Sequence, residues 1–261
     1  MKNVSRHNQY PSAFISGGGT TSIHPRNPYI IAWWNAAFPG FGHLLLSKIS
    51  RGLILFMWEV VVNLHTNLNS AILYSIQGHF SEAMAILDTK WLFMYMPVYL
   101  FGIWDAYRTT VDLNNLYTLI ETRKTPIKRF SISRFEINHL DKRRPLMAVM
   151  WSLFIPGLGQ LYLHQIIIAF FSISWTLIFL YFSNFFDALH LLFLGDINMA
   201  TATLDPMWFL FMPSLYGFSV YHAYISTVEF NNLFDREQTR FLNSNYQQGP
   251  YPLPQTTFKR E

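Results

Sequence analysis

Glu59 is the side chain whose surroundings in this sequence most strongly suggest chemistry. It is the only carboxylate placed well inside an apolar run, and because a buried charge is costly, such a residue is a functional candidate. The alternative is that Glu59 lies near an interface or pairs with Lys48, Arg51 or His43. A later segment of similar sequence carries Thr176 at the matching position, so the fold itself does not require this carboxylate.

His43 and Gln160 stand at matching places, each directly after a Pro-Gly-x-Gly motif, at residues 39–42 and 156–159. Proline removes a helix hydrogen bond and glycine permits a sharp turn, so each motif predicts a break in an apolar segment. Both side chains can form hydrogen bonds. We expect them to satisfy backbone groups that the break leaves free, with proton transfer by His43 as the alternative.

Two asparagine pairs also recur at matching places, Asn114-Asn115 and Asn231-Asn232. Asparagine is a poor helix former, yet both pairs fall in expected helices just beyond an apolar run. One interpretation is hydrogen bonding between two helical extensions, and the other is a docking surface for a partner. The sequence leaves both interpretations open.

No arrangement of residues predicts a metal, a cofactor or a catalytic centre. The sequence has no cysteine, and its nine histidines include no His-x-x-x-His pair. It also lacks a Gly-x-Ser-x-Gly motif, a phosphate-binding loop and a dinucleotide-binding fingerprint. We therefore expect a protein without cofactor or catalytic residues, with an enzyme acting on a lipid or peptide kept as an alternative.

Composition indicates which class of protein holds these residues. Hydrophobic residues make up 51% of the chain and charged residues 13%, against about 25% charged residues in soluble proteins. Aromatic residues reach 18%, which excludes a disordered chain. Long runs almost free of charge are separated by compact charged segments, as is typical of an integral membrane protein. These runs are residues 29–46, 53–64, 91–104, 146–163, 166–182 and 208–221.

The chain contains one unit twice, at an offset of 117 residues. Residues 39–42 match 156–159, and residues 110–116 (TVDLNNL) match 227–233 (TVEFNNL). Hydrophobic composition alone does not align Pro, Gly, Asp and Asn positions in this way. Each unit reads as an opening segment broken by Pro-Gly-x-Gly, a second apolar helix, a polar excursion, and a third apolar helix that continues as a polar one.

The predicted fold class is an all-α integral membrane protein of two tandem pseudo-symmetric repeats, each with a Pro-Gly-broken segment, two further apolar helices and an interfacial excursion. Asp88 and Asp205 are expected to cap helices in the two excursions. The predicted division is a disordered cytoplasmic tail (1–27), repeat 1 (28–121), a basic connector (122–144), repeat 2 (145–242) and a disordered tail (243–261).

The distribution of charge predicts the topology, because Lys and Arg accumulate in cytoplasmic segments. The connector holds eight basic and two acidic residues, whereas the excursions at 64–90 and 183–207 hold one Lys and no Arg. Both termini and the connector are therefore expected in the cytoplasm. Since the apolar runs are short for a bilayer, we expect four full crossings plus two broken segments that enter part-way. Six crossings, with inverted units, is the alternative.

The segment Pro156-Gly157-Leu158-Gly159-Gln160-Leu161-Tyr162-Leu163 resembles the bacterial two-transmembrane-helix domain family. The first unit is similar at Pro39-Gly40-Phe41-Gly42, at Arg51-Gly52 and at Trp104-Asp105. The resemblance implies membrane residence and a compact helical pair, with Asp105 as a candidate polar site. It implies no reaction, because the family has no common activity.

A duplicated membrane unit without catalytic residues favours a non-enzymatic scaffold or regulator of other membrane components in the cell membrane. The expected partners are the lipid bilayer and another membrane protein. Nucleic acid is not expected, because the basic residues lie beside apolar runs. The alternative is a small transporter or channel subunit, with a pathway between the repeats lined by the two broken segments and Glu59.

Overall fold

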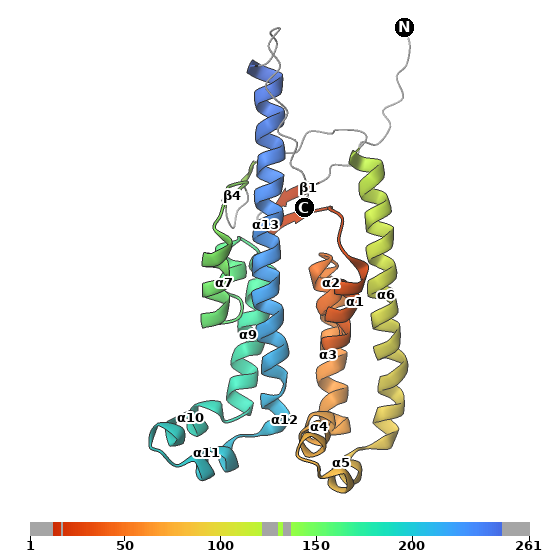
Figure 1. The fold of residues 1–261 in the computed structure, drawn as a ribbon, viewed down its shortest axis with the longest axis vertical. Coiled ribbons are helices and arrows are strands. Elements are labelled where there is room, and N and C mark those ends of the chain that lie inside the picture. The colour runs from red at the N-terminus through yellow and green to blue at the C-terminus, as the bar shows by residue number, and fades with distance from the viewer. Residues whose placement is uncertain (1–12, 17, 122–129, 133–136, 247–261) are drawn as a thin grey trace.

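The computed structural model describes residues 13–16, 18–121, 130–132 and 137–246, and this part of the chain is all-α, with 78% helix. Two short antiparallel strand pairs accompany the helices. They are β1 (Ala13–Ser16) with β2 (Gly19–Ser22), and β3 (Phe130–Ile132) with β4 (Ile137–His139). Both pairs lie beside the middle of the long C-terminal helix (Figure 1).

We call repeat 1 unit 1 and repeat 2 unit 2. Unit 1 begins with a helical hairpin. α1 (Pro28–Ala37) runs antiparallel to the second half of α6 (Thr89–Glu121), from the Arg26–Asn114 contact to the hydroxyl of Tyr99, which donates to the carbonyl of Ala36 at 2.8 Å. At 1.5 Å per residue these contacts lie about 22 Å apart along α6. The chain then turns at residues 39–40 and returns as α2 (Phe41–Leu45), with Gly42 against the backbone of Ile31.

The rest of unit 1 leads away from this hairpin and back. α3 (Ile49–Thr66) runs to the far end of the molecule, α4 (Leu68–Ile76) and α5 (Phe80–Ile86) lie across that end, and α6 returns. The order of elements is therefore the one that the broken motif and the apolar periodicity predict.

Unit 2 repeats this order. Its elements are α7 (Pro145–Phe154), α8 (Leu158–Tyr162), α9 (Ile166–Phe182), α10 (Phe185–Phe193), α11 (Ile197–Thr203), α12 (Pro206–Phe209) and α13 (Phe211–Tyr246). The short helices α4, α5, α10 and α11 all lie at the same end (Figure 1). The two units thus point the same way, and the alternative of inverted units is not found.

The backbone repeats in detail at the offset of 117 residues. Ser47 and His164 both have positive φ, at 59° and 56°, as do Asn67 and Asn184, at 58° and 53°. Left-handed backbone at these paired positions is what turns the chain between the helices of each unit. The prediction that Asp88 and Asp205 cap helices is confirmed, because their carboxylates accept backbone N–H groups of the following turn.

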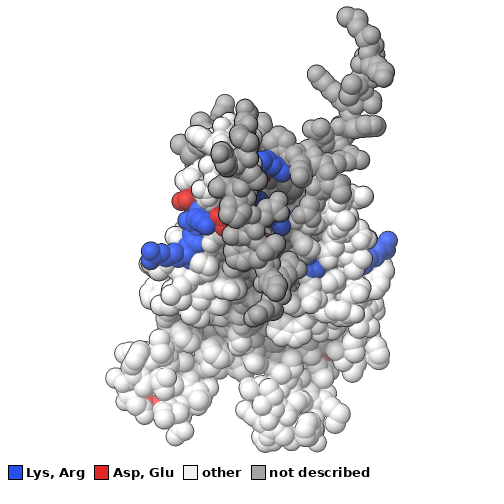
Figure 2. Space-filling model, turned by 45° about the horizontal axis from the view of Figure 1, so that its top comes forward, with Lys and Arg blue, Asp and Glu red and all other residues white. Residues whose placement is uncertain are grey.

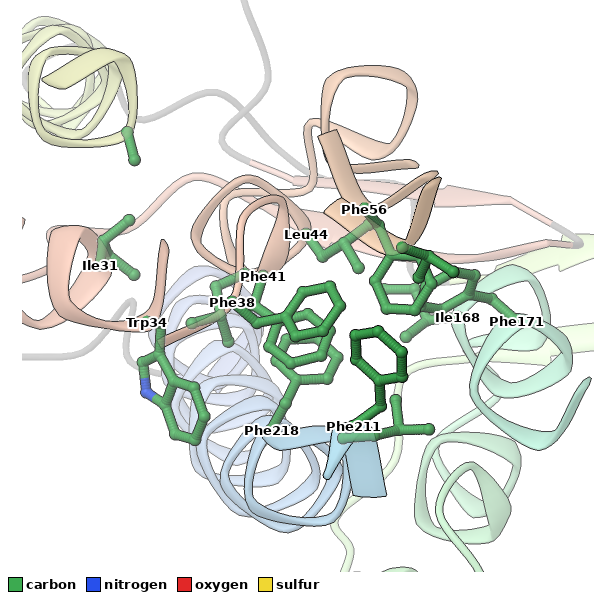
Figure 3. Close-up of a cluster of buried hydrophobic side chains, with 14 of the residues drawn as sticks. Ile31, Trp34, Phe38, Phe41, Leu44, Phe56, Ile168, Phe171, Phe211 and Phe218 are labelled. Atoms are coloured by element: carbon green, nitrogen blue, oxygen red, sulfur yellow. The ribbon is translucent and has the colours of Figure 1, made fainter. Parts of the chain in front are cut away.

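The two units meet across a seam of aromatic rings. Unit 1 contributes Phe38, Phe41 and Phe56, and unit 2 contributes residues of α9 and α13. The rings of Phe41 and Phe218 stack at 4.1 Å, and Phe56 contacts Phe171 at 4.7 Å. Figure 3 shows these side chains packed against one another from both units. We call this set the aromatic seam; it comprises Phe38, Phe41, Phe56, Phe171, Trp175, Phe179, Phe211 and Phe218.

The predicted disordered tails need correction where the structure describes them. Residues 13–16 and 19–22 form a hairpin that packs on unit 2, with Gly19 beside the backbone of His164, and Asn138 of β4 donates to Ser16 at 2.9 Å. At the other end α13 continues to Tyr246. The polar composition did not predict either feature, because contacts with distant parts of the chain stabilise them.

Residues 1–12, 17, 122–129, 133–136 and 247–261 lie outside the described part, and with them most of the basic connector and of the C-terminal tail.

Among the described residues, no single helix combines the length and the apolar character needed to cross a membrane alone. One pair, α9 and α10, meets the requirement when its two helices are taken together, across a bend of 62°.

Candidate functional site

A buried polar network occupies the break of unit 1. Asn35 of α1 and His43 of α2 are both fully buried. The side-chain oxygen of Asn35 accepts the N–H of Gly40 at 2.9 Å and lies 3.1 Å from Nδ1 of His43. On its other side, Nε2 of His43 lies 2.9 Å from the carboxylate of Asp105 on α6, which also accepts from Arg51 at 3.0 Å. The network therefore joins the hairpin to α3 and α6.

In unit 2 different residues form the hydrogen bonds at the break. The N–H of Gly157 donates to the hydroxyl of Ser219 at 3.0 Å, and the amide of Gln160 donates to the backbone carbonyl of Ser219 at 2.7 Å. The position that matches Asn35 holds Ser152, and the position that matches Ser219 holds Gly102. The acceptor for the glycine at the break thus comes from the opening helix in unit 1 and from the long helix in unit 2.

Asparagine on the opening helix of unit 1 occurs together with glycine on its long helix, because space beside Asn35 is limited. A Cβ added to Gly102 would lie 2.9 Å from the side-chain nitrogen of Asn35. A side chain at position 102 would therefore require the amide of Asn35 to move.

This reciprocity predicts non-additive variants. Asn35→Ser should leave the N–H of Gly40 without its acceptor and lower the free energy of unfolding by about 1–3 kcal/mol. Gly102→Ser alone should destabilise through its contact with Asn35. The double variant should recover part of both losses, because the new hydroxyl can accept from Gly40 as Ser219 does from Gly157. Unfolding of purified protein by SDS titration measures this cycle, and strictly additive losses would contradict it.

The prediction that His43 satisfies the backbone at the break is wrong. The N–H of Gly40 donates to Asn35, and His43 contacts Asn35 and Asp105 instead. Gln160 acts there only through Ser219. Asn35 was not predicted as a site residue, although the sequence holds a signal: apart from His43 it is the one strongly polar side chain in the run at 29–46. Ser219 carried no such signal, because serine is common on helices of every kind.

Glu59 is buried, with 5% of its surface exposed, and none of its expected partners contacts it. Arg51 and His43 are engaged by Asp105 instead. The carboxylate of Glu59 accepts from Asn63 at 3.3 Å and neighbours the hydroxyl of Tyr95.

Glu59 is the inner end of a chain of hydrogen bonds that reaches unit 2. Asn63 also donates to Asn69 at 3.1 Å, and Asn69 donates to the backbone carbonyl of Met207 at 2.8 Å. Unit 2 carries Thr176, Leu180 and Phe186 at the positions of Glu59, Asn63 and Asn69. The network therefore exists once, and its outer end links the two units where α4 meets α12.

Asn114 and Asn231 make the same clamp in the two units. The amide of Asn114 accepts the N–H of Arg26 at 2.9 Å and donates to its carbonyl at 2.8 Å. Asn231 holds Arg143 with the same two bonds at the same distances. Neither sequence interpretation anticipated this role, which fixes the entry of each opening helix within its own unit. The second asparagines, Asn115 and Asn232, are exposed.

The clamps make a prediction with an internal control. Asn114→Ala should lower the free energy of unfolding by about 1–2 kcal/mol, because it leaves one N–H and one carbonyl of Arg26 without their partners. Asn115→Ala should change it by less than about 0.5 kcal/mol, as expected of an exposed position. SDS titration of both variants measures the difference, and equal losses would argue against the clamp.

A polar cavity lies between the units at the end of the molecule that holds the helical hairpins α1–α2 and α7–α8, which we call the hairpin end. Its lining includes β2, the start of α9 and the side chains of Gln165, His222 and Ser226. Arg26 and Glu229 also line the cavity, and the guanidinium of Arg26 donates to the carboxylate of Glu229 at 2.8 Å. His24 also contacts Glu229. The lining also includes the apolar side chains of Leu45 and Ile168, which belong to the same buried cluster as the aromatic seam.

In the part of the chain that the structure describes, no three His, Asp or Glu side chains converge as a metal site would require. The candidate polar residues instead occupy separate places: His43 with Asp105, Glu59 with Asn63, Gln160 with Ser219, and the two clamps. No family model matches the chain, and searches of curated proteins and of solved structures likewise return no similar protein.

Proposed function

We propose that this chain is a non-enzymatic multi-pass membrane protein that serves as a scaffold or regulator of other membrane components. Support for membrane residence comes from the outer surface, where large apolar side chains are exposed on several helices, among them Trp33, Ile54, Phe93, Phe101 and Phe170. The visible Lys and Arg side chains gather towards the hairpin end, while the opposite lobes show no Lys or Arg and little Asp or Glu on this face (Figure 2).

In the proposed arrangement α3, α6, α9 and α13 cross the bilayer, and the hairpins α1–α2 and α7–α8 enter part-way. α3 has 18 residues and is about 27 Å long, close to the roughly 30 Å of a hydrocarbon core. The glycine breaks would lie at membrane depth, where their backbone groups need partners from protein. Asn35 and Ser219 supply those partners.

The aromatic seam is the observation that carries the scaffold proposal. A pathway between the repeats would have to pass through rings that are stacked from both units, and five of these rings are almost completely buried: Phe41, Phe56, Phe179, Phe211 and Phe218. Rigid, filled contact between two units suits a protein that presents fixed surfaces to partners. α13 offers one such surface, since it projects about 22 Å beyond its clamp at Asn231.

A small transporter or channel subunit is the second candidate, favoured by the polar cavity. Buried His222 and Gln165 line it, and each has a side-chain atom without a hydrogen-bond partner. Such groups could receive a small polar solute from the hairpin end.

Liposomes containing the purified protein separate the two candidates. The scaffold proposal expects no flux of K⁺, chloride or protons above that of empty liposomes, with an ionophore as positive control. Flux that Glu59→Gln or His222→Ala abolishes would overturn it in favour of a transporter.

Membrane topology has its own test, because the chain has no cysteine. In intact cells, an impermeant thiol reagent should label Asn198→Cys in the excursion of unit 2 and should not label Ser244→Cys near the end of α13. The opposite pattern, or labelling of both, would contradict the proposed orientation.

A further inference from the structure

The two units bind each other through different faces. Trp34 of α1 packs against Phe218 and Tyr221 of α13, with ring centroids 6.2 and 5.0 Å apart. In a two-fold arrangement the matching Trp151 of α7 would pack in the same way against α6. Instead Trp151 is 48% exposed, while Trp34 is 8% exposed. The contact is therefore heterologous, and it leaves one matching face open on each unit.

Both open faces keep the residue types of the contact. Phe101 and Trp104 of α6 stand where α13 has Phe218 and Tyr221. They are 54% and 52% exposed. All three positions of the internal contact thus hold aromatic rings. The three matching positions of the open faces hold aromatic rings as well.

Charge repeats along with the rings. The ion pair between Arg26 of unit 1 and Glu229 of unit 2 spans the internal contact at 2.8 Å. The matching residues are Arg143 in unit 2 and Asp112 in unit 1. Asp112 is exposed on α6, on the same helix as Phe101 and Trp104, and its carboxylate lies 4.0 Å from the guanidinium of Arg108 one turn earlier. The α7 side thus keeps the positive member of the pair and the α6 side keeps the negative one.

We propose that these faces bind a second copy of this chain, α7 of one copy against α6 of the next, repeating the contact of α1 with α13. Trp151 would pack against Phe101 and Trp104 of the neighbour, and Arg143 would approach its Asp112. Because the contact is head-to-tail, copies add in one direction and form a ring if the rotation closes or a linear array if it does not. The proposal rests on the proposed scaffold function and names its partner as the protein itself.

One position differs between the internal contact and the proposed one. Gly217 lies beside Trp34, so that an added Cβ would be 3.6 Å from the indole, and the matching residue of α6 is Leu100. The larger side chain holds the neighbouring indole farther from α6. Leu100→Gly should therefore strengthen the association between copies.

Cysteine crosslinking in the membrane tests the proposal. Two tagged variants, Trp151→Cys and Phe101→Cys, are co-expressed and treated with a short thiol crosslinker. A mixed dimer is expected, and each variant expressed alone should give at least tenfold less dimer, because a head-to-tail contact does not bring identical positions together. The double variant Trp34→Cys with Tyr221→Cys, at positions whose rings lie 5.0 Å apart, should crosslink within one chain and serves as the control for reagent access.

The charge pair refines the test. Asp112→Arg should lower the yield of mixed dimer, and combining it with Arg143→Asp on the other copy should restore it. Absence of mixed dimer while the internal control crosslinks would overturn the proposal and leave lipid as the cover of both faces. Equal crosslinking of each variant alone would also overturn it, in favour of a symmetric or random contact. Neither outcome affects the liposome flux result, which decides the proposed function separately.

Discussion

Gly40→Ala is expected to destabilise the protein strongly, because the methyl group that it adds has no room beside α3. The added Cβ would lie 2.3 Å from the carbonyl oxygen of Gly52 and 2.9 Å from the backbone nitrogen of Phe56, and φ at this position is 101°. Since both neighbours are backbone, no side-chain rotation relieves the clash. Overpacking and left-handed strain together suggest a loss of about 4 kcal/mol.

Gly78→Ala is the matched control. Its φ of 83° is also positive, but an added Cβ there would meet nothing within 4 Å. Only the backbone strain remains, at about 1–2 kcal/mol. SDS titration of the two purified variants measures the difference. Similar losses for both would show that the close approach of α2 to α3 does not stabilise the hairpin.

Phe218→Ala is expected to cost about 3–5 kcal/mol of unfolding free energy, the range for removing a buried Phe. Its ring is fully buried and stacks on Phe41 at 4.1 Å with an interplanar angle of 15°. Truncation should leave a cavity in the aromatic seam, because Phe38, Phe41 and Phe211 are held by further ring contacts and cannot close over it.

Phe101→Ala is the control for Phe218, since it makes the same chemical change at the matching position of unit 1. Phe101 is exposed, so its truncation should change unfolding of the monomer by less than about 0.5 kcal/mol. The same variant should weaken head-to-tail association. Equal destabilisation by the two truncations would mean that the seam does not hold the units together.

The motifs with strong local constraints were readable from the sequence. Pro-Gly-x-Gly at residues 39–42 and 156–159 predicted two helical hairpins, because proline and glycine act on the backbone at their own positions. The offset of 117 residues predicted matching elements, and the paired left-handed residues Ser47 and His164 agree with it. Asp88 and Asp205 were identifiable as caps for the same reason, since a cap acts within one turn of helix.

The tertiary structure alone decided which polar residues meet. The sequence left Arg51 and His43 as partners for Glu59, but the packing of α2 and α3 against α6 places both beside Asp105. Asn114 and Asn231 could have joined the long helices to each other, but each is closed by two bonds to the start of its own unit.

The sequence likewise did not determine which faces of the two units pack against each other. Trp34 and Trp151 are identical residues at matching positions, yet one is buried and the other exposed. A repeat specifies the same local structure twice, because backbone turns and caps depend on nearby residues. Which faces of two equal units meet depends on the fit of whole surfaces, here Phe38, Phe41 and Phe56 against the rings of α9 and α13, and that fit exists only once the units have folded.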